Sequence, residues 1–348
     1  MEWGVGIQGP SNIPWLKKLF GPILVLEGDR GYLNGLGGSG WLRVMNNGSN
    51  WHDSDNWARH CVSLMGEVHR YGCRTLIPLN EANLRDEGAF GTDGRPTLDS
   101  GEDGYRQLGD WGNDFIPRLR QYLNDAGMGD VKICWPNLSP FHGELEYGYS
   151  YLANSMRQSD IIGTHFYINY PGISWDQGRN IVAQTSDYIH NNLGIWKPMA
   201  CTEYNAYNVD PGNHNSVWTY CDQVKGWNDY LESLGYGWSF MFLGSHTDPS
   251  FHNLDISSMP GALERLCELR GYNCGGQAGP PDDEPPPPGS PCPNGYHQHP
   301  VTGLCIPDTT TPPAGGGQSA MATFATAFLG IIAVSAGAYI LYDKLMED

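Results

Sequence analysis

The chain has 348 residues, of which 40% are hydrophobic, enough apolar content to bury one large core. Its formal net charge of -18 would repel a phosphate backbone, and no stripe rich in lysine and arginine offsets that repulsion. Nucleic acid is therefore excluded as a partner. The 12 tryptophans and 19 tyrosines suit stacking on a neutral ligand, although core packing would account for many of these rings equally well.

Short apolar runs recur along the chain before Cys274, and most show the nearly continuous hydrophobicity of strands buried on both faces. In chain order they are WGVGIQG, ILVLEG, WLRVMN, TLIPLNE, VKICWPN, IIGTHFY, PMACTEY and GWSFMFLG. A helical period of 3.6 residues marks three intervening segments, 57–68, 105–122 and 217–231. We expect Ser54 to cap the first of these helices.

Strands that alternate with helical crossovers predict an α/β fold, a (β/α)8 TIM barrel spanning residues 1–274. Two features predict an irregular first half. The segment GDRGYLNGLGGSG between the second and third runs is too rich in glycine for a helix. Pro78 removes a hydrogen-bond donor inside the fourth run.

Two carboxylates stand at predicted strand ends. Asn80 and Glu81 close the fourth run, and Glu203 closes the seventh. Strands four and seven of such a barrel lie on opposite sides of its mouth, so the two glutamates can converge on one ligand. Cleavage of a glycosidic bond needs such a pair, one to protonate the leaving oxygen and one to attack or to activate water. Taken alone, Glu81 could equally cap the next segment or pair with Arg85.

The strand ends carry motifs in an order that resembles the retaining clan A glycoside hydrolases over about residues 2–243. These motifs are Asn80-Glu81, His165-Phe166-Tyr167, Thr202-Glu203-Tyr204 and Trp238. The resemblance implies that Glu81 is the acid/base and that Glu203 is the nucleophile.

The resemblance also implies sugar contacts for three residues. Asn80 would hydrogen-bond the sugar 2-hydroxyl. His165 would contact the sugar or the residues that support the catalytic groups. Trp238 would form the floor of the subsite that holds the ring to be cleaved. Without the resemblance, a histidine such as His165 on an apolar strand is more often a hydrogen-bonded core residue than a catalytic one. A tryptophan such as Trp238 is likewise more often a core residue than a sugar-binding platform.

Two further residues are implied to act on the nucleophile. Tyr167 would hold Glu203 ionised and oriented through its hydroxyl group. Arg43 resembles the strand arginine that keeps the nucleophile charged, because a nearby cation favours the ionised carboxylate.

Two long loops are expected to wall the substrate cleft. They are residues 82–103 after the fourth strand and 168–175 after the sixth, and the second would supply Tyr170 and Trp175 to neighbouring subsites. No metal or cofactor is expected in the barrel, because its sequence lacks an HExxH pair, an EF-hand spacing and a phosphate-binding loop.

The cysteines fall into two groups. Five lie in apolar periodic segments and are expected to be buried thiols: Cys61, Cys73, Cys134, Cys201 and Cys221. The other four are disulfide candidates, since Cys267 and Cys274 close a short loop and Cys292 and Cys305 bracket a segment too poor in apolar residues to fold unaided. Zinc held by Cys292, His297, His299 and Cys305 is the alternative for the second pair.

The composition changes after Cys274. We expect a Pro-rich acidic linker at 275–291, the Cys-bracketed loop at 292–305, a second linker at 306–321, a transmembrane helix at 322–342 and a short tail at 343–348. The predicted helix, Ala322 to Tyr342, contains no charged residue and would place a lipid bilayer among the partners.

Together these features predict a membrane-anchored retaining glycoside hydrolase that acts on a β-linked glycan, a polysaccharide or an oligosaccharide. The head is expected outside the cytoplasm or on a virus particle, although no signal-peptide pattern precedes the first strand. The alternatives are a non-catalytic protein that binds glycan or attaches a virus particle to it, and a scaffold without a ligand.

Overall fold

The structure, a computed structural model, describes most of the first 272 residues and two short strands beyond them. The described residues are 1–8, 16–17, 19–46, 51–84, 87, 90, 101–140, 142–168, 174–206, 213–246, 255–272, 296–298 and 305–307.

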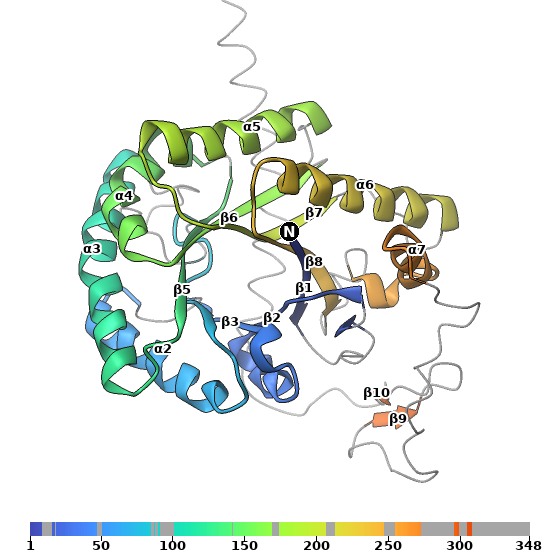
Figure 1. The fold of residues 1–348 in the computed structure, drawn as a ribbon, viewed down its shortest axis with the longest axis horizontal. Coiled ribbons are helices and arrows are strands. Elements are labelled where there is room, and N and C mark those ends of the chain that lie inside the picture. Colours follow the sequence, from blue (N-terminus) through green and yellow to red (C-terminus); the bar gives the residue numbers. More distant parts are fainter. Residues whose placement is uncertain are drawn as a thin grey trace, which may run out of the picture.

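Eight parallel strands close into a barrel in chain order, with β1 pairing with both β2 and β8 (Figure 1). Their bounds are β1 Glu2–Gln8, β2 Ile23–Leu26, β3 Gly40–Arg43, β4 Thr75–Ile77, β5 Lys132–Leu138, β6 Ile161–Ile168, β7 Met199–Ala206 and β8 Trp238–His246. Each predicted run forms one strand, so the predicted barrel is confirmed.

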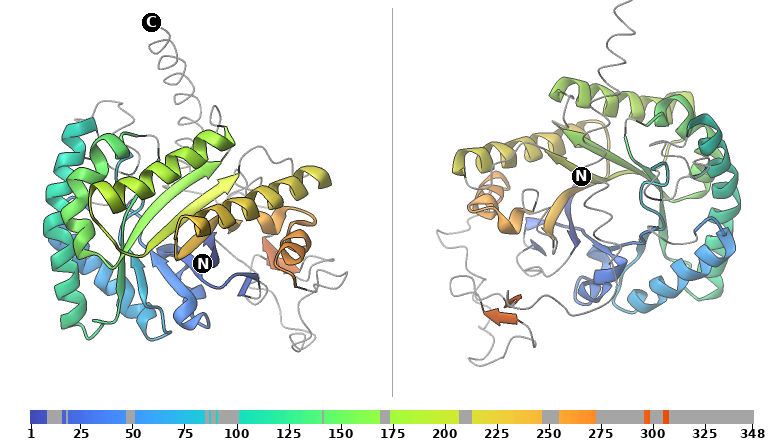
Figure 2. Two further views of the ribbon diagram at one scale, coloured as in Figure 1. Left: turned by 45° about the horizontal axis from the view of Figure 1, so that its top comes forward. Right: turned by 180° about the vertical axis from the view of Figure 1, so that it is seen from behind.

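Helices pack around the outside of the strands in both views of Figure 2. The α-helices are α2 Ser54–His69, α3 Gly101–Asp125, α4 Tyr149–Gln158, α5 Trp175–Asp187, α6 His214–Ser233 and α7 Ala262–Leu269. The three predicted helices correspond to α2, α3 and α6. The side chain that caps α2 belongs to Asp53, which accepts from the amides of Asp55 and Asn56, and not to Ser54 as expected.

The sequence analysis did not identify α4 and α5, although the buried residues Tyr149, Leu152, Ala153 and Met156 of α4 have helical spacing. On α5 the buried positions include Gly178, Thr185 and Ser186, which are small or polar residues. The helix therefore packs closely on the barrel without an apolar stripe that a sequence pattern could reveal. Shorter helical turns complete the described chain: η1 Glu27–Leu33, η2 Gly37–Ser39, η4 Glu144–Gly148, η5 Tyr188–Asn192 and η7 Ile256–Ser258.

The first half of the barrel is irregular in one of the two expected ways. The chain between β2 and β3 forms η1 and η2 and no α-helix, as its glycine content predicts. The expectation for Pro78 was wrong, because β4 ends at Ile77 and the proline follows the strand. The Pro78 carbonyl accepts from the indole N–H of Trp57 at 2.9 Å, which ties the strand end to α2.

The interior of the barrel is a packed core. Its buried apolar residues are Leu24, Trp41, Ile77, Cys134, Ile161, Ala200 and Phe240. A second and larger cluster fills the space between strands and helices. The five cysteines expected to be buried thiols are buried and free. The barrel therefore leaves its reactive groups to the strand ends and not to a central channel.

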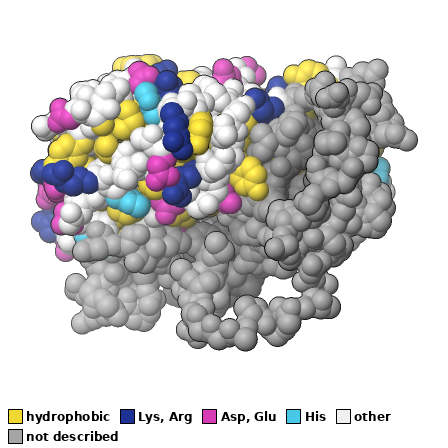
Figure 3. Space-filling view, turned by 90° about the horizontal axis from the view of Figure 1, so that it is seen from below, with side chains coloured by type: hydrophobic (Ala, Val, Ile, Leu, Met, Phe, Trp, Pro, Cys, Tyr) yellow, Lys and Arg dark blue, Asp and Glu magenta, His cyan; other side chains and the backbone are white. Residues whose placement is uncertain are grey.

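Charged side chains of both signs are interspersed over the described part of the face drawn in Figure 3. Several form surface ion pairs, such as Arg59 with Asp55 at 2.9 Å and Arg265 with Asp222 at 2.7 Å. Exposed pairs of this kind each contribute about 0 to 1 kcal/mol, so the fold depends mainly on its apolar core.

The C-terminal expectations fall almost entirely outside the described residues. The described part is a two-stranded antiparallel sheet, β9 Tyr296–Gln298 with β10 Cys305–Pro307. Cys267 is disulfide-bonded, but Cys274, Cys292, both linkers and Ala322 to Tyr342 lie outside the described residues. No helix among the described residues is long and apolar enough to cross a membrane. The disulfide pairings and the transmembrane helix stay predictions of the sequence.

A glycine on β6 gives a test of the interior packing. A Cβ atom at Gly163 would lie 1.9 Å from Oδ1 of Asn137 and 2.9 Å from Sγ of Cys134. Gly163→Ala must displace Asn137, which accepts from the Thr202 hydroxyl at 2.7 Å. We expect the free energy of unfolding in urea to fall by about 2 kcal/mol or more.

The control is Gly6→Ala on β1, where the nearest atom to a Cβ is the Met241 carbonyl oxygen at 3.8 Å. It should change the free energy of unfolding far less. Equal stability of the two variants would show that the packing around Gly163 is not as tight as described.

Candidate active site

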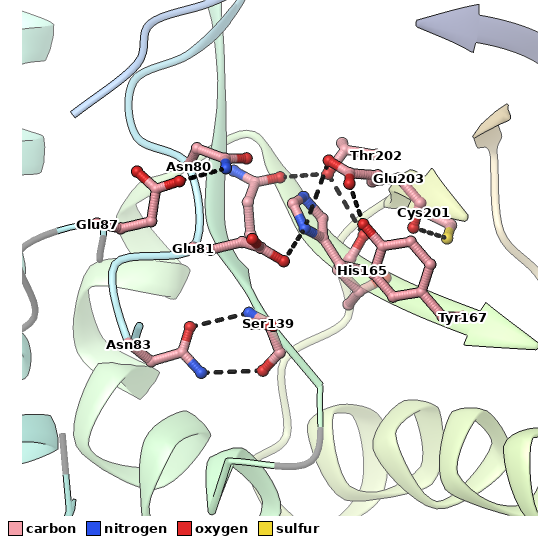
Figure 4. Close-up of polar contacts among 12 residues, drawn as sticks. Asn80, Glu81, Asn83, Glu87, Ser139, His165, Tyr167, Cys201, Thr202 and Glu203 are labelled. Carbon is pink, nitrogen blue, oxygen red and sulfur yellow. Dashed lines mark hydrogen bonds and ion pairs between the residues drawn. The ribbon is translucent and has the colours of Figure 1, made fainter. Parts of the chain in front are cut away.

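The candidate site lies at the carboxyl ends of β3, β4, β6 and β7 (Figure 4). Arg43 is the last residue of β3, Glu81 follows β4, and Glu203 lies on β7. On β6, His165 pairs in register with Glu203. Barrel closure thus brings the two predicted carboxylates together although 122 residues separate them.

Glu203 is buried and receives a donor on each oxygen. Nη1 of Arg43 donates to its Oε2 at 2.6 Å, and the hydroxyl of Tyr167 donates to its Oε1. Nη2 of the same arginine donates to the Thr202 carbonyl at 2.7 Å, which fixes the guanidinium. The side chains of Arg43 and Glu203 are only 2% and 7% exposed. A buried ion pair with hydrogen bonds on both carboxylate oxygens holds the carboxylate in one orientation.

Glu81 sits in an unusual backbone conformation, with φ at 35°. This left-handed region is uncommon for residues other than glycine and is often found at functional sites. Its amide donates to the Asn137 carbonyl at 3.1 Å, and the next turn closes where the amide of Leu84 donates to the Glu81 carbonyl at 2.8 Å. These contacts fix the direction of the side chain.

His165 bridges the two carboxylates. Its Nδ1 lies 3.0 Å from Oε1 of Glu81 and 3.8 Å from Oε2 of Glu203. Because the same nitrogen is that close to both, the two oxygens are at most about 7 Å apart, within reach of one glycosidic bond. His165 is buried at 1% exposure, so it lies behind the carboxylates and does not offer its ring to a sugar.

Opposing influences act on the pKa of Glu81. Burial is the largest of them and raises the pKa, because it disfavours the charged form. The hydrogen bond and the charge of His165, together with Ser139 and Arg43, outweigh burial and leave the pKa lowered. The carboxylate is therefore stabilised in its ionised form by the residues that surround it.

Glu87 is a third buried carboxylate at the site, and the sequence analysis did not identify it. It is 3% exposed, and burial, followed by the negative charges of Glu81 and Glu203, raises its pKa well above the usual range. Its carboxylate accepts from Nδ2 of Asn80 at 3.2 Å. In the sequence Glu87 lies in the charged stretch Arg85–Glu87, which has no feature that distinguishes it from a solvated loop.

Asn80 is held by the loop that follows β3. Its amide donates to Oδ1 of Asn46 at 3.0 Å, and Nδ2 of Asn46 donates to the Glu87 carbonyl at 2.8 Å. The indole of Trp51 donates to the same carbonyl at 2.9 Å. The side-chain oxygen of Asn80 is buried without a hydrogen-bond partner among the described residues.

Trp238 does not reach this site. It is the first residue of β8 and pairs in register with Glu2, the first residue of β1. Its indole donates to the Glu2 carboxylate at 3.0 Å, and its ring lies 5.5 Å from that of Trp41. These residues line a pocket of about 460 Å³ at the amino end of the barrel. The prediction that Trp238 floors the sugar subsite was wrong, because the site lies at the opposite end.

Further along β8 the strand draws level with the site. Met241 pairs in register with Tyr204, the residue after Glu203. Phe242 follows directly, where the pairing of β8 with β1 shifts register. It is 5% exposed, and the Phe242–Leu243 peptide bond is cis.

The two other predicted subsite residues do not join the described site. Tyr170 lies outside the described residues. Trp175 begins α5 and its ring packs edge to face on Trp227 of α6 at 5.5 Å, so it stands between helices outside the barrel and not in a cleft. No group of three or more histidine, cysteine or acidic side chains is placed to hold a metal in the described part of the chain.

The raised pKa of Glu87 predicts a pH-dependent cost to stability. The folded state binds the Glu87 proton more tightly than the unfolded chain does, where the pKa is about 4.3. The stabilisation is therefore fully present below that pH and is lost as the pH rises towards the folded-state pKa. Glu87→Gln stays neutral throughout, so we expect it to be more stable than wild type by about 1 kcal/mol or more at pH 8 and nearly equal at pH 4.

Urea unfolding at both pH values measures this difference. Glu67→Gln is the control, because that exposed carboxylate pairs with Arg30 and its pKa is lowered. It should show no gain at pH 8. A Glu87→Gln variant less stable than wild type at pH 8 would contradict the burial argument.

The sequence and the structure were compared with those of known proteins. No protein-family model and no curated protein sequence matches the chain. The structure is similar to a calcium-binding mutant of Bacteroides uniformis beta-glucuronidase 2, with a TM-score of 0.53 and 13% identity over 73% of this chain and 32% of that one. This chain thus spans about a third of the glucuronidase.

Two further structures are similar at lower scores. A glycoside hydrolase family 5 enzyme from Prevotella bryantii B14 has a TM-score of 0.49 and 12% identity, covering 75% of this chain and 87% of that one. A family 30 endoxylanase from Clostridium papyrosolvens C71 has a TM-score of 0.48 and 12% identity, covering 77% and 70%. The similarity to the glucuronidase, at 13% identity, shows the fold: the chain forms a barrel of the kind found in a glycoside hydrolase.

Proposed function

We propose that this protein is a retaining glycoside hydrolase that cleaves a β-linked glycan by double displacement. The observation that carries the proposal is the pair of buried carboxylates, Glu81 and Glu203, that share His165 at the barrel mouth. Retaining enzymes hold their carboxyl groups about 5 to 5.5 Å apart and inverting ones about 6.5 to 9.5 Å. The upper limit of about 7 Å between one oxygen of each group includes the retaining spacing and only the short end of the inverting range.

Glu203 is the proposed nucleophile. Arg43 and Tyr167 supply it with a cation and a hydroxyl donor, which hold the carboxylate in one orientation. In the first step its oxygen bonds to the anomeric carbon while the bond to the leaving oxygen breaks. Glu81 gives that oxygen a proton. In the second step Glu81 takes a proton from water, whose oxygen attacks the anomeric carbon and releases Glu203.

The lowered pKa of Glu81 suits the second step, in which it acts as a base. The first step requires the protonated form. Burial already raises the pKa of Glu81, and the contact with His165 is the main influence that opposes burial. His165 is therefore the residue that sets the pH range of activity in this mechanism.

Replacing the two carboxylates tests the assignment. With a panel of aryl β-glycosides and β-linked polysaccharides, Glu203→Gln should lose turnover of every substrate, because no glycosyl-enzyme forms. Glu81→Gln should lose about 10²- to 10⁴-fold on polysaccharide. On a dinitrophenyl glycoside it should still release the phenol in a burst, since that leaving group needs no proton.

Glu144→Gln is the control for loss of a buried carboxylate, since Glu144 lies on η4 and is 4% exposed. It should keep activity. Turnover unaffected by either site change would reject the assignment. Binding of glycan without turnover by the wild type would support the alternative, a non-catalytic glycan-binding protein.

A histidine replacement tests the pKa argument. The basic limb of the pH profile of kcat/KM reports the protonated acid in the free enzyme. His165→Leu removes the hydrogen bond and the charge that lower the pKa of Glu81, so burial should prevail and raise that pKa. We expect the basic limb to move to higher pH by about one unit. A lower rate with an unmoved limb would mean that His165 only supports the structure.

Membrane anchoring through Ala322 to Tyr342 belongs to the same proposal and rests on the sequence alone. An enzyme held at a membrane by an extended, semi-rigid Pro-rich stalk would act on glycan at that surface.

A further inference from the structure

The pocket of about 460 Å³ at the amino end of the barrel lies away from the strand ends that hold Glu81 and Glu203. Its lining includes Glu2 at the start of β1 and Lys132 at the start of β5. The volume falls within the range of about 300 to 1,000 Å³ that is usual for sites of small ligands. None of the lining residues takes part in the proposed double displacement.

Positive side chains are concentrated in this pocket. Arg74, Lys132 and Arg270 line it, and Glu2 is the single carboxylate among the described lining residues. The chain as a whole has 38 acidic and 20 basic residues, so an excess of cations in one place differs from the average of the protein. Such a local excess favours an anion in the pocket.

One of the three cations is already paired and one is not. Arg74 forms an ion pair with Asp130 and donates to the His69 carbonyl at 2.8 Å, so it is tied to the protein. Lys132 is exposed and forms no ion pair with any described residue. Its ammonium group is therefore available to a ligand.

Arg270 is held by aromatic rings and not by an acid. Its guanidinium carbon lies 5.5 Å from the ring centre of Trp3 and 5.7 Å from that of Tyr272. A guanidinium stacked on rings keeps the N–H groups at its edge free, and these form a fork that matches a carboxylate. Within the described part of the chain, no carboxylate of the protein occupies that fork.

The rest of the lining suits a sugar. Trp3, Trp41 and Trp238 supply aromatic surface, and the rings of Trp41 and Trp238 lie 5.5 Å apart. The indole of Trp238 donates to Oε2 of Glu2 at 3.0 Å, which leaves Oε1 without a partner among the described residues. Indole rings pack on the apolar face of a pyranose, and a carboxylate oxygen accepts from its hydroxyl groups. A phosphate group would offer the indoles no apolar face and would bring more negative charge to Glu2.

We propose that this pocket is a second, non-catalytic binding site for a hexuronic acid, a sugar that carries a carboxylate. The carboxylate of the sugar binds Lys132 and Arg270, a hydroxyl group donates to Glu2, and the apolar face of the ring packs against the tryptophans. The inference does not depend on the proposed function, because the pocket and the catalytic carboxylates lie at opposite ends of the barrel.

The test measures dissociation constants by calorimetric titration of the full chain. The probes are galacturonic acid, its neutral parent galactose, acetate and inorganic phosphate. Galacturonic acid should bind about 10-fold or more tightly than each of the other three, because it alone combines the carboxylate with the hydroxyl groups and the apolar face of the ring.

Variants of the pocket locate the binding. Lys132→Ala and Arg270→Ala should each weaken galacturonic acid by about 10-fold. Glu2→Ala should weaken galacturonic acid but not acetate, since it removes an acceptor for hydroxyl groups together with a negative charge. Lys225→Ala is the matched control, because this lysine pairs with Asp229 on α6 outside the pocket. It should leave the affinity unchanged.

Urea unfolding confirms that each variant is folded. Should Arg270→Ala fail to fold through loss of packing on Trp3, Lys132→Ala carries the test by itself, since that side chain is exposed. Glu203→Gln should bind galacturonic acid as tightly as wild type, which separates the pocket from the catalytic site.

Four results would overturn the inference. No binding of galacturonic acid would reject the site. Equal affinity for acetate or phosphate would show a site for any anion and not for a sugar. Binding that survives Lys132→Ala at full strength would place the ligand elsewhere. Binding lost in Glu203→Gln would place it at the catalytic carboxylates. A wild type that cleaves no glycoside but binds galacturonic acid through Lys132 would reject the proposed function and support this inference.

Discussion

The buried ion pair between Arg43 and Glu203 is the interaction on which the site depends. Three carboxylates, Glu81, Glu87 and Glu203, lie buried at one barrel mouth. Arg43 contacts Glu203, and its positive charge also acts on the pKa of Glu81 and of Glu87. Carboxylates gathered this closely cannot all be ionised without compensation. Removing the arginine would leave an uncompensated buried charge, so it supports both stability and chemistry.

That constraint drives the protonation of the other two groups in opposite directions. His165 and its neighbours lower the pKa of Glu81, while burial and the two nearby negative charges raise that of Glu87. Titratable groups whose environments separate their pKa values are the usual mark of acid and base chemistry. A neutral Glu87 also makes the cluster less costly to bury. Glu87 then accepts from Asn80, while Glu81 and Glu203 are the proposed acid/base and nucleophile.

The strands were predictable because parallel strands buried on both faces have a continuous apolar pattern, and each such run became one strand. The chemistry at β4 and β7 was predictable for a related reason. A polar pair such as Asn80-Glu81 after a buried run needs a wet or functional site. The helix α5 was not predictable, since its buried face contains Gly178, Thr185 and Ser186.

The sequence by itself determined the barrel, the strand ends and the two carboxylates, because strand period and chain order are local properties. Only the tertiary structure decided that Trp238 lies away from the site, because its register with Glu2 places it at the amino end of the barrel. It also decided that Glu87 is buried, since burial depends on what other segments cover and not on the residue itself.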